Sequence, residues 1–192
     1  MKVISYHTLT TAAAALLLAS CGPKLDSTTV LMSTVPVTKS DGSLAGTIHS
    51  QVNSYRQSKG REVLQRHAGL DRMAQQHSEF MRRNRGKFSG KNAAANISHY
   101  GFEERALNAQ RTMKMSNVAE NIATCSGSHS SAANTLVGAW KNSSSHDKNM
   151  RGKWSTTGIG VVVDKDGTVF ATQLFATESH SHMALTDRMR QF

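Results

Sequence analysis

The chain has 192 residues, a formal net charge of +10 and a hydrophobic content of 38%. This length allows one domain with its own core, and after residue 20 no apolar run is long enough to cross a membrane. The basic excess favours anionic partners. Nucleic acid is not among those we expect, because aromatic residues make up only 6% of the chain and the basic residues are dispersed.

The N-terminus has the pattern of an export signal. Lys2 precedes an apolar block at residues 12–18, which ends in Leu18-Ala19-Ser20-Cys21-Gly22. A charged start, a short apolar core and small residues are typical of a secretion signal, and a cysteine after Leu-Ala-Ser resembles the lipobox of bacterial lipoproteins. We therefore predict a signal peptide over residues 1–20 and lipidation of Cys21, which would anchor the protein to a membrane of the bacterial envelope, facing the periplasm or the cell surface. A buried N-terminal helix is the alternative.

Residues 21–42 are rich in Ser, Thr, Lys and Pro and show no sustained periodicity. This composition favours a flexible tether between the lipidated cysteine and the domain; the alternative is a loosely attached strand at residues 30–37. With Cys21 acylated, Cys125 has no partner within the chain, so it is a free thiol or forms an intermolecular bridge.

Two amphipathic helices follow, over residues 43–58 and 70–84. Apolar residues recur at helical spacing in both, and Gly60 is a plausible stop for the first. His77 lies in the apolar stripe of the second helix, whose outward face we assign to Arg72, Gln76, Glu79 and Arg83. It is either a core histidine with a hydrogen-bonded ring or a ligand to a bound group. The stripe comprises Leu70, Met73, Ala74, His77 and Met81.

The centre of the sequence carries the candidate site. After a loop at residues 85–98 and a short helix at 102–110, anchored by Leu107, residues 117–123 have the pattern of a strand on which Glu120 faces the same way as Val118 and Ile122. A glutamate on an apolar strand face is costly unless it has partners. His99 and His146 lie at comparable distances on either side. We predict that His99, Glu120 and His146 meet in one pocket.

The last third of the chain predicts a helix and a hairpin. Ser131 is a plausible N-cap for a helix to Trp140, and residues 143–145 end it. Residues 157–163 and 169–176 form the hairpin, whose glycines at 158 and 160 leave one face bare, so a helix or the Trp140 region should pack closely there. The tail after residue 177 is polar, and its His180 and His182 form a pair that can bind metal adventitiously. This order of elements predicts an α/β sandwich of three layers. The buried stripe of the helix comprises Ala132, Ala133, Leu136, Val137 and Trp140.

These motifs, in this order, resemble the CAP superfamily of cysteine-rich secretory, antigen 5 and pathogenesis-related proteins, in particular its bacterial SCP-like branch. The resemblance implies a CAP domain over residues 43–177, a polar tail at 178–192, and an α-β-α sandwich with a small, mostly antiparallel central sheet. The matching stretches are Val52-Asn53-Ser54-Tyr55-Arg56, Leu70 to Met81, Ser98-His99, Ala119-Glu120-Asn121-Ile122-Ala123, Trp140 to Asn149, Thr157-Gly158-Ile159-Gly160-Val161 and Ala171-Thr172-Gln173-Leu174-Phe175.

In many members of that family two histidines and two glutamates converge in a central cleft. The resemblance assigns the first histidine to His99, the first glutamate to Glu120 and the second histidine to His146. The second glutamate has no match, because Ser143 stands three residues after the tryptophan. Glu103 or Glu104 could approach the cleft instead.

Three kinds of chemistry remain open for the cluster of His99, Glu120 and His146. Two imidazoles and one carboxylate could hold zinc or another divalent metal with an open position, although no cofactor is certain. The three could instead form a hydrogen-bonded cluster that ties helices to sheet. Finally, Glu120 could act as a general base with a histidine, with Cys125 or a serine of residues 143–145 available as a nucleophile by type alone.

We therefore expect one of two functions. The first is a lipid-anchored envelope protein that binds a lipid, a metal, a glycan or a protein in a His/Glu-lined cleft, with anionic lipids or envelope polymers as partners. The second is an envelope hydrolase or peptidase in which Glu120, His99 and His146 serve as acid and base groups or as metal ligands. The family resemblance does not favour the second, because peptidase activity is not general in the family.

Overall fold

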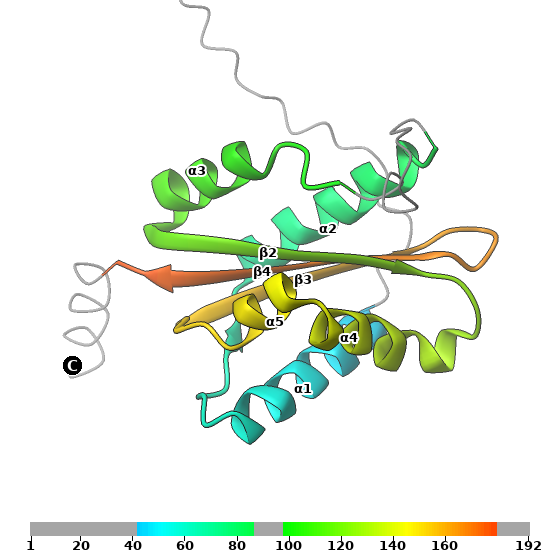
Figure 1. Cartoon of the computed structure of the whole chain (residues 1–192). Coiled ribbons are helices and arrows are strands. Elements are labelled where there is room, and N and C mark those ends of the chain that lie inside the picture. Colours follow the sequence, from blue (N-terminus) through cyan, green and yellow to red (C-terminus); the bar gives the residue numbers. More distant parts are fainter. Residues whose placement is uncertain (1–41, 87–97, 180–192) are drawn as a thin grey trace, which may run out of the picture. The chain divides into compact units, whose positions relative to one another are not determined.

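A four-stranded sheet lies between two layers of helices in the computed structural model (Figure 1). The structure describes residues 42–86 and 98–179. The predicted signal peptide, Cys21, most of the tether, and the tail with His180 and His182 lie outside these ranges. Helices α2 (Ala68–Arg83) and α3 (Phe102–Met113) cover one face of the sheet, and α1 (Gly42–Ser58), α4 (Ala132–Asn142) and α5 (Ser144–Met150) cover the other (Figure 1). The predicted three-layer α-β-α sandwich is confirmed.

The sheet has the strand order β1-β3-β4-β2. The pair of β1 and β3 is parallel, and the pairs of β3 with β4 and of β4 with β2 are antiparallel. This confirms a small, mostly antiparallel sheet, in which β2 lies at an edge. The strands are β1 (Gln65–Arg66), β2 (Met115–Cys125), β3 (Thr156–Val163) and β4 (Val169–Glu178).

The four helices expected from the sequence all form, and three short elements were missed, namely α5, β1 and a 3₁₀ turn. Helix α5, which carries His146, was not predicted, because Met150 is its only buried residue and so no apolar stripe marks it. The two-residue strand β1 has no pattern of its own and depends on its pairing with β3. The helices are α1 (Gly42–Ser58), α2 (Ala68–Arg83), α3 (Phe102–Met113), the 3₁₀ turn η2 (His129–Ser131), α4 (Ala132–Asn142) and α5 (Ser144–Met150).

The hydrophobic core has a larger part under the sheet and a smaller part above it. The stripes predicted for α2 and α4 are buried in full. The lower part, against α1, α4 and α5, is built around Ile48, Leu136, Trp140, Ile159 and Phe175. The upper part, against α2 and α3, includes Leu70, Ala74, Ala109 and Leu174, with Met81, Ile122 and Phe170 beside them.

Two local expectations were wrong, and a third, the N-cap of α4, was right in position but not in its hydrogen bond. Leu107 is 43% exposed, and Ala109 is the buried residue of α3 instead. Glu79 is buried rather than outward, because Arg82 and Arg83 of the next turn pair with its carboxylate. Ser131 does occupy the N-cap of α4, but its hydroxyl donates to the carbonyl of Ser128 and caps no backbone N–H.

Helix α2 lies directly on the hairpin, as the two glycines predicted. A Cβ added at Gly160 would lie 2.1 Å from the backbone nitrogen of Gln75, and one at Gly158 would lie 2.2 Å from the carbonyl carbon of Leu70. Side chains of α2 also satisfy the exposed edge of β3. Asp71 accepts the N–H of Ile159 at 2.8 Å, and Gln75 accepts that of Val161 at 3.0 Å. Backbone donors that would otherwise template a further strand are therefore paired.

Within residues 42–86 and 98–179, no helix combines the length and the apolarity that crossing a membrane requires.

Candidate functional site

Strand β2 directs Glu120 toward α2 and α3. Side chains alternate across a strand, and Val118 and Ile122 pack in the upper part of the core while Ala119 and Ala123 pack in the lower part. Glu120 therefore shares the upper face with Val118 and Ile122, as predicted. Its side chain is 1% exposed, so its charge depends on partners supplied by the helices above it.

Arg105 of α3 is the main partner of Glu120. Its Nε donates to Glu120 Oε2 and its Nη2 donates to Oε1, each at 2.8 Å, and its Nη1 donates to the carbonyl of Tyr100, also at 2.8 Å. This two-pronged geometry is the strong form of an ion pair. Sequence reasoning missed Arg105. A usable signal was its position four residues before Ala109, which puts it on the inward face of the helix.

His99 also reaches Glu120, and this part of the prediction is confirmed. Its Nδ1 donates to Oε1 at 2.9 Å. Burial on its own raises the pKa of the Glu120 carboxyl, but hydrogen bonds from His99 and Arg105 and the nearby charges of His77 and Arg105 lower the pKa below its ordinary value. Glu120 is therefore an ionised, fully engaged acceptor, which makes it a weak proton acceptor.

His77 is a core histidine, the first of the two interpretations that its sequence position allowed. It is 3% exposed, and its Nε2 donates to the carbonyl of Ser98 at 2.8 Å, with Glu120 Oε1 3.9 Å away. Burial lowers the pKa of His77 to about 4, against the opposing charge of Glu120. The ring is therefore neutral at pH 7.

His146 approaches the cluster from the other side of the sheet. It lies on α5, below the edge strand β2, and its ring centroid is 6.2 Å from that of His99. Burial and the charge of His99 lower the pKa of His146. Asn121 holds this arrangement by donating to the carbonyl of His146 at 3.1 Å, and Asn149 of α5 donates to the carbonyl of Glu120 at 3.1 Å. The Glu-Asn pair on β2 thus connects the helices of both layers.

The donor set does not fit a metal ion. In the described part of the chain, no group of three or more His, Cys, Asp or Glu side chains is arranged to hold one. Both oxygens of Glu120 accept from the Arg105 guanidinium. This cation therefore already occupies the position from which a metal ion would bind the carboxylate. At the position of the missing glutamate, the Ser143 hydroxyl lies 3.2 Å from that of Ser145.

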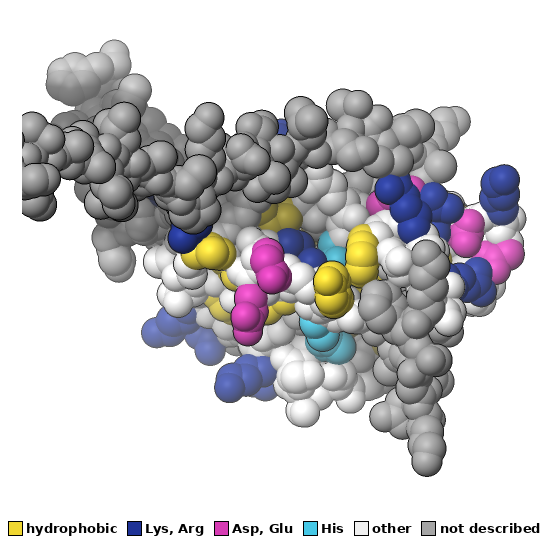
Figure 2. Space-filling model, turned by 90° about the horizontal axis from the view of Figure 1, so that it is seen from above, with side chains coloured by type: hydrophobic (Ala, Val, Ile, Leu, Met, Phe, Trp, Pro, Cys, Tyr) yellow, Lys and Arg dark blue, Asp and Glu magenta, His cyan; other side chains and the backbone are white. Residues whose placement is uncertain are grey.

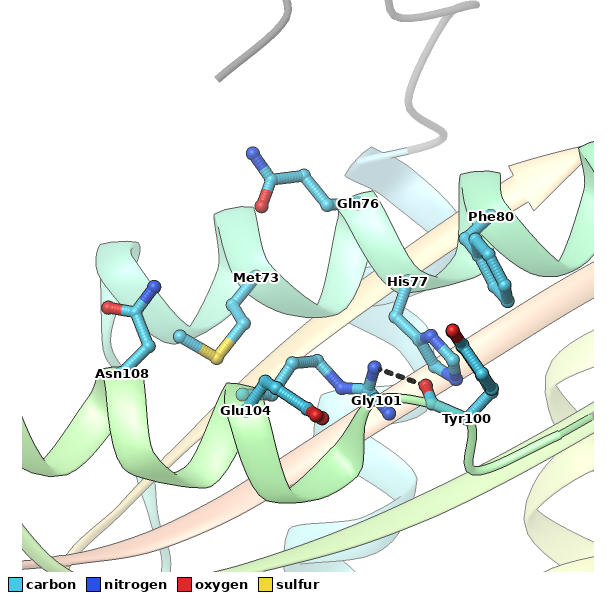
Figure 3. Close-up of a pocket in the computed structure, with 9 residues that line it drawn as sticks. Met73, Gln76, His77, Phe80, Tyr100, Gly101, Glu104 and Asn108 are labelled. Atoms are coloured by element: carbon cyan, nitrogen blue, oxygen red, sulfur yellow. Dashed lines mark hydrogen bonds between the residues drawn. The ribbon is translucent and has the colours of Figure 1, made fainter. Parts of the chain in front are cut away.

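A groove of about 290 Å³ opens between α2 and α3 (Figures 2 and 3). His99, Glu120 and His146 lie next to one another at strand β2 but do not line this groove. Arg105 and His77 stand between the groove and Glu120 and line it themselves. Glu104, which could have replaced the missing glutamate, lines the groove, and Glu103 is exposed beside it. The lining residues are Met73, Gln76, His77 and Phe80 of α2, Tyr100 and Gly101 of the preceding loop, and Glu104, Arg105 and Asn108 of α3.

One wall of the groove is aromatic. The rings of His77 and Phe80 are stacked with centroids 5.8 Å apart, and those of Phe80 and Tyr100 with centroids 5.5 Å apart. Tyr100 is 66% exposed. Figure 3 shows these rings together at one end of the groove, with Met73 and Asn108 toward the other end.

Cys125 has little of the character of a nucleophile. It is half-buried, and burial raises the pKa of its thiol, so the reactive thiolate is disfavoured.

Comparisons with known proteins agree with this architecture. The model of the cysteine-rich secretory protein family, CAP, matches residues 49–175. The chain is similar to an outer surface protein from Borrelia burgdorferi, with a TM-score of 0.56 and 15% identity over 72% of this chain and 95% of that one. A cysteine-rich secretory protein from Staphylococcus aureus gives a TM-score of 0.52 and 17% identity over 74% of this chain and 41% of that one.

At these identities the two likenesses show the fold alone, and the search of curated proteins gave no match. The family match, by contrast, covers well over half of the chain and includes His99, Glu120 and His146. With the predicted sandwich and the Glu-Asn motif in place, the chain belongs to the CAP family of cysteine-rich secretory proteins.

Proposed function

We propose that this CAP protein is a binding module that takes a small ligand in the groove between α2 and α3. The proposal rests on one observation: the groove is open, whereas Arg105 and Glu120 behind it are hydrogen-bonded to each other. The groove offers about 290 Å³ and an aromatic wall, whereas Arg105 and Glu120 satisfy each other at its floor. Concave sites with apolar walls and a few fixed polar groups are typical of small-molecule binding.

The same contacts argue against the hydrolase alternative. A general base must take a proton during the reaction, and its pKa should lie near the working pH. The pKa of Glu120 is instead lowered by the hydrogen bonds of His99 and Arg105, and its side chain is 1% exposed. Arg105 would have to leave before water or substrate could reach the carboxylate.

The size of the groove narrows the ligand. Pockets for drug-sized molecules measure about 300–1,000 Å³, so this groove, at about 290 Å³, lies at the small end. A single ring or a short chain fits this volume, while a complete sterol or diacyl lipid would extend beyond the groove. Of the ligand classes considered from the sequence, metal is disfavoured by the donor set.

The proposal includes the setting of the module. The export signal and the lipobox-like Leu18-Ala19-Ser20-Cys21 support a lipid-anchored envelope protein, with residues 22–42 as the tether. The similar protein from Borrelia burgdorferi is an outer surface protein, which agrees with this setting. A formal charge of +10 also suits an anionic lipid or polymer surface nearby.

A groove-filling variant tests the binding function. The purified protein would be titrated with a panel of small cationic, neutral and anionic ring compounds, short-chain lipids and sugars while amide chemical shifts are followed. At least one class should perturb residues lining the groove. Asn108→Trp should abolish these shifts by filling the groove, whereas Gln110→Trp should not, because Gln110 is exposed on the same helix but does not line the groove. The proposal is overturned if no compound perturbs the groove, or if both variants bind as the parent does.

A further inference from the structure

We infer that the ligand of this groove is a small amine, with a protonated nitrogen beside Glu104 and an apolar ring or short chain against Phe80 and Tyr100. The inference rests on the proposed binding function and names its ligand class. It follows from the balance of charge within the groove, from its aromatic wall and from its volume.

Among the described residues, two charged side chains line the groove, Glu104 and Arg105, and of these Arg105 alone is paired with another described residue. All three nitrogens of the Arg105 guanidinium donate hydrogen bonds, two of them to Glu120. The Glu104 carboxylate is exposed on the groove and takes part in no hydrogen bond or ion pair with the described residues. Since His77 is neutral at pH 7, the charge left for a ligand is negative, on a protein whose net charge is +10.

Among the described residues that line the groove, an anionic ligand finds no cationic donor that is free of a protein partner. Arg105 could bind a carboxylate or phosphate only by giving up Glu120, and this would leave a buried charge unpaired at a cost of several kcal/mol. Glu104 would repel the same ligand. The local charge therefore selects against the anions that the overall charge of the protein attracts.

The remaining walls suit an ammonium group attached to an apolar body. Aromatic faces attract cations within about 6 Å of the ring centroid, and Tyr100, whose ring stacks on Phe80, is 66% exposed as a residue. Met73 and Phe80 offer apolar contact, and the side-chain oxygen of Asn108, which already accepts from the Thr112 hydroxyl at 2.9 Å, lies on the same helix as Glu104. Figure 2 shows acidic, hydrophobic and histidine side chains next to one another on this face. A volume of about 290 Å³ accommodates a single ring or a short chain.

Three probes of nearly equal size separate charge from shape. Phenethylamine, 2-phenylethanol and phenylacetate share the ring and differ in the charge of the end group. The dissociation constant of each would be measured by amide chemical-shift titration of the purified protein at low and at high salt. We expect phenethylamine to bind most tightly and phenylacetate most weakly, with the advantage of the amine reduced at high salt.

The neighbouring glutamates provide matched variants. Glu104→Gln should weaken phenethylamine binding on the order of fivefold and leave 2-phenylethanol unchanged, as expected for one partly exposed ion pair. Glu103→Gln removes the same charge one residue away, from a side chain that does not line the groove, and should have little effect.

The inference is overturned if 2-phenylethanol binds as tightly as the amine, or if the two glutamate variants behave alike. It is also overturned if phenethylamine does not bind while another compound of the panel does so in a manner that Asn108→Trp blocks. In each of these outcomes the groove remains a binding site with a different ligand. Failure of every compound, by contrast, overturns the binding function itself.

Discussion

Arg105 and Glu120 form a buried ion pair, and neither partner can be removed alone without leaving the other unsatisfied. The side chain of Glu120 is 1% exposed and that of Arg105 is 14% exposed. Arg105→Met should therefore lower the free energy of unfolding by about 3–5 kcal/mol, measured by urea denaturation. The double variant Arg105→Met/Glu120→Gln should recover part of this loss because the buried charge is gone. Losses that simply add in the double variant would contradict the pairing.

His77 makes the protein sensitive to mild acid. Burial lowers its pKa from an ordinary value of 6.5 to about 4, so between these values the unfolded chain binds a proton that the folded state does not. The contribution of the neutral His77 to the free energy of unfolding should be fully present above pH 6.5. It should decrease as the pH falls toward 4, by an amount on the order of 3 kcal/mol. Below pH 4.5 protonation of Glu120, whose folded pKa is also lowered, should decrease stability further.

His77→Gln tests this assignment, because glutamine can still donate to the Ser98 carbonyl but does not titrate. The free energy of unfolding would be measured from pH 8 to pH 4 for both proteins. The variant should show a shallower dependence between pH 6.5 and 4. The charged groups near this ring, Glu120, Arg105 and His99, are unchanged, and His146 keeps a smaller dependence of the same sign. Equal slopes would show that other groups carry the acid sensitivity.

At the residue scale, the sequence predicted the acceptor of the site but not its main donor. Glu120 was recognisable because a carboxylate on an apolar strand face needs partners, and His99 stood within reach in the family motif. Arg105 was not recognised, because exposed arginines are common on short helices and only the packing of α3 on β2 turns this one inward. The groove is lined by residues of α2 and α3 and not by His99 or His146.

Helix α2 and strand β3 are in direct backbone contact, so their two glycines are structural requirements. Gly160→Ala would place a Cβ 2.1 Å from a backbone nitrogen of α2, which must push the helix off the sheet. We expect a loss of stability on the order of 3 kcal/mol. Because α2 also carries Met73, His77 and Phe80, the variant should change the amide chemical shifts of the groove as well.

Gly138→Ala is the matched control for this prediction. Gly138 lies inside α4, and a Cβ there would meet nothing within 4 Å. Because alanine favours the helix, this variant should gain about 0.5–1 kcal/mol. Thermal or urea denaturation of the two variants should therefore shift in opposite directions. A stable Gly160→Ala protein would contradict the close contact between α2 and β3.

At the element scale, the sequence predicted the helices and strands that have a periodic apolar pattern. It missed the short elements that are held in place by their neighbours. Helices α2 and α4 carry long apolar stripes and were expected with their buried residues correct. Helix α5 has one buried residue, and β1 has two residues held by the parallel pairing with β3. Neither contains enough residues to show a period, although α5 positions His146 and Asn149 against β2.

The whole molecule combines a basic chain with a groove of opposite local charge. A charge of +10 would hold the protein near an anionic surface. In the groove, by contrast, Arg105 is paired with Glu120, and the remaining charge is the negative charge of Glu104. An anchored protein of this kind would bind anions on its general surface and cations in its groove. Anionic polymers would contact the general surface, and the groove would remain open to small amines.

This arrangement depends on the proposed lipid attachment at Cys21. The chain has two cysteines, so Cys125 provides a matched control for a test of that attachment. Expressed at full length in a bacterial host supplied with an alkyne-tagged fatty acid, the protein should acquire the label and sediment with membranes. Cys21→Ser should abolish both properties, because diacylation requires that thiol. Cys125→Ser should retain them, because Cys125 is half-buried in the domain beside the core under the sheet. Label that persists in Cys21→Ser, or disappears in Cys125→Ser, would remove the basis for placing the anchor at Cys21.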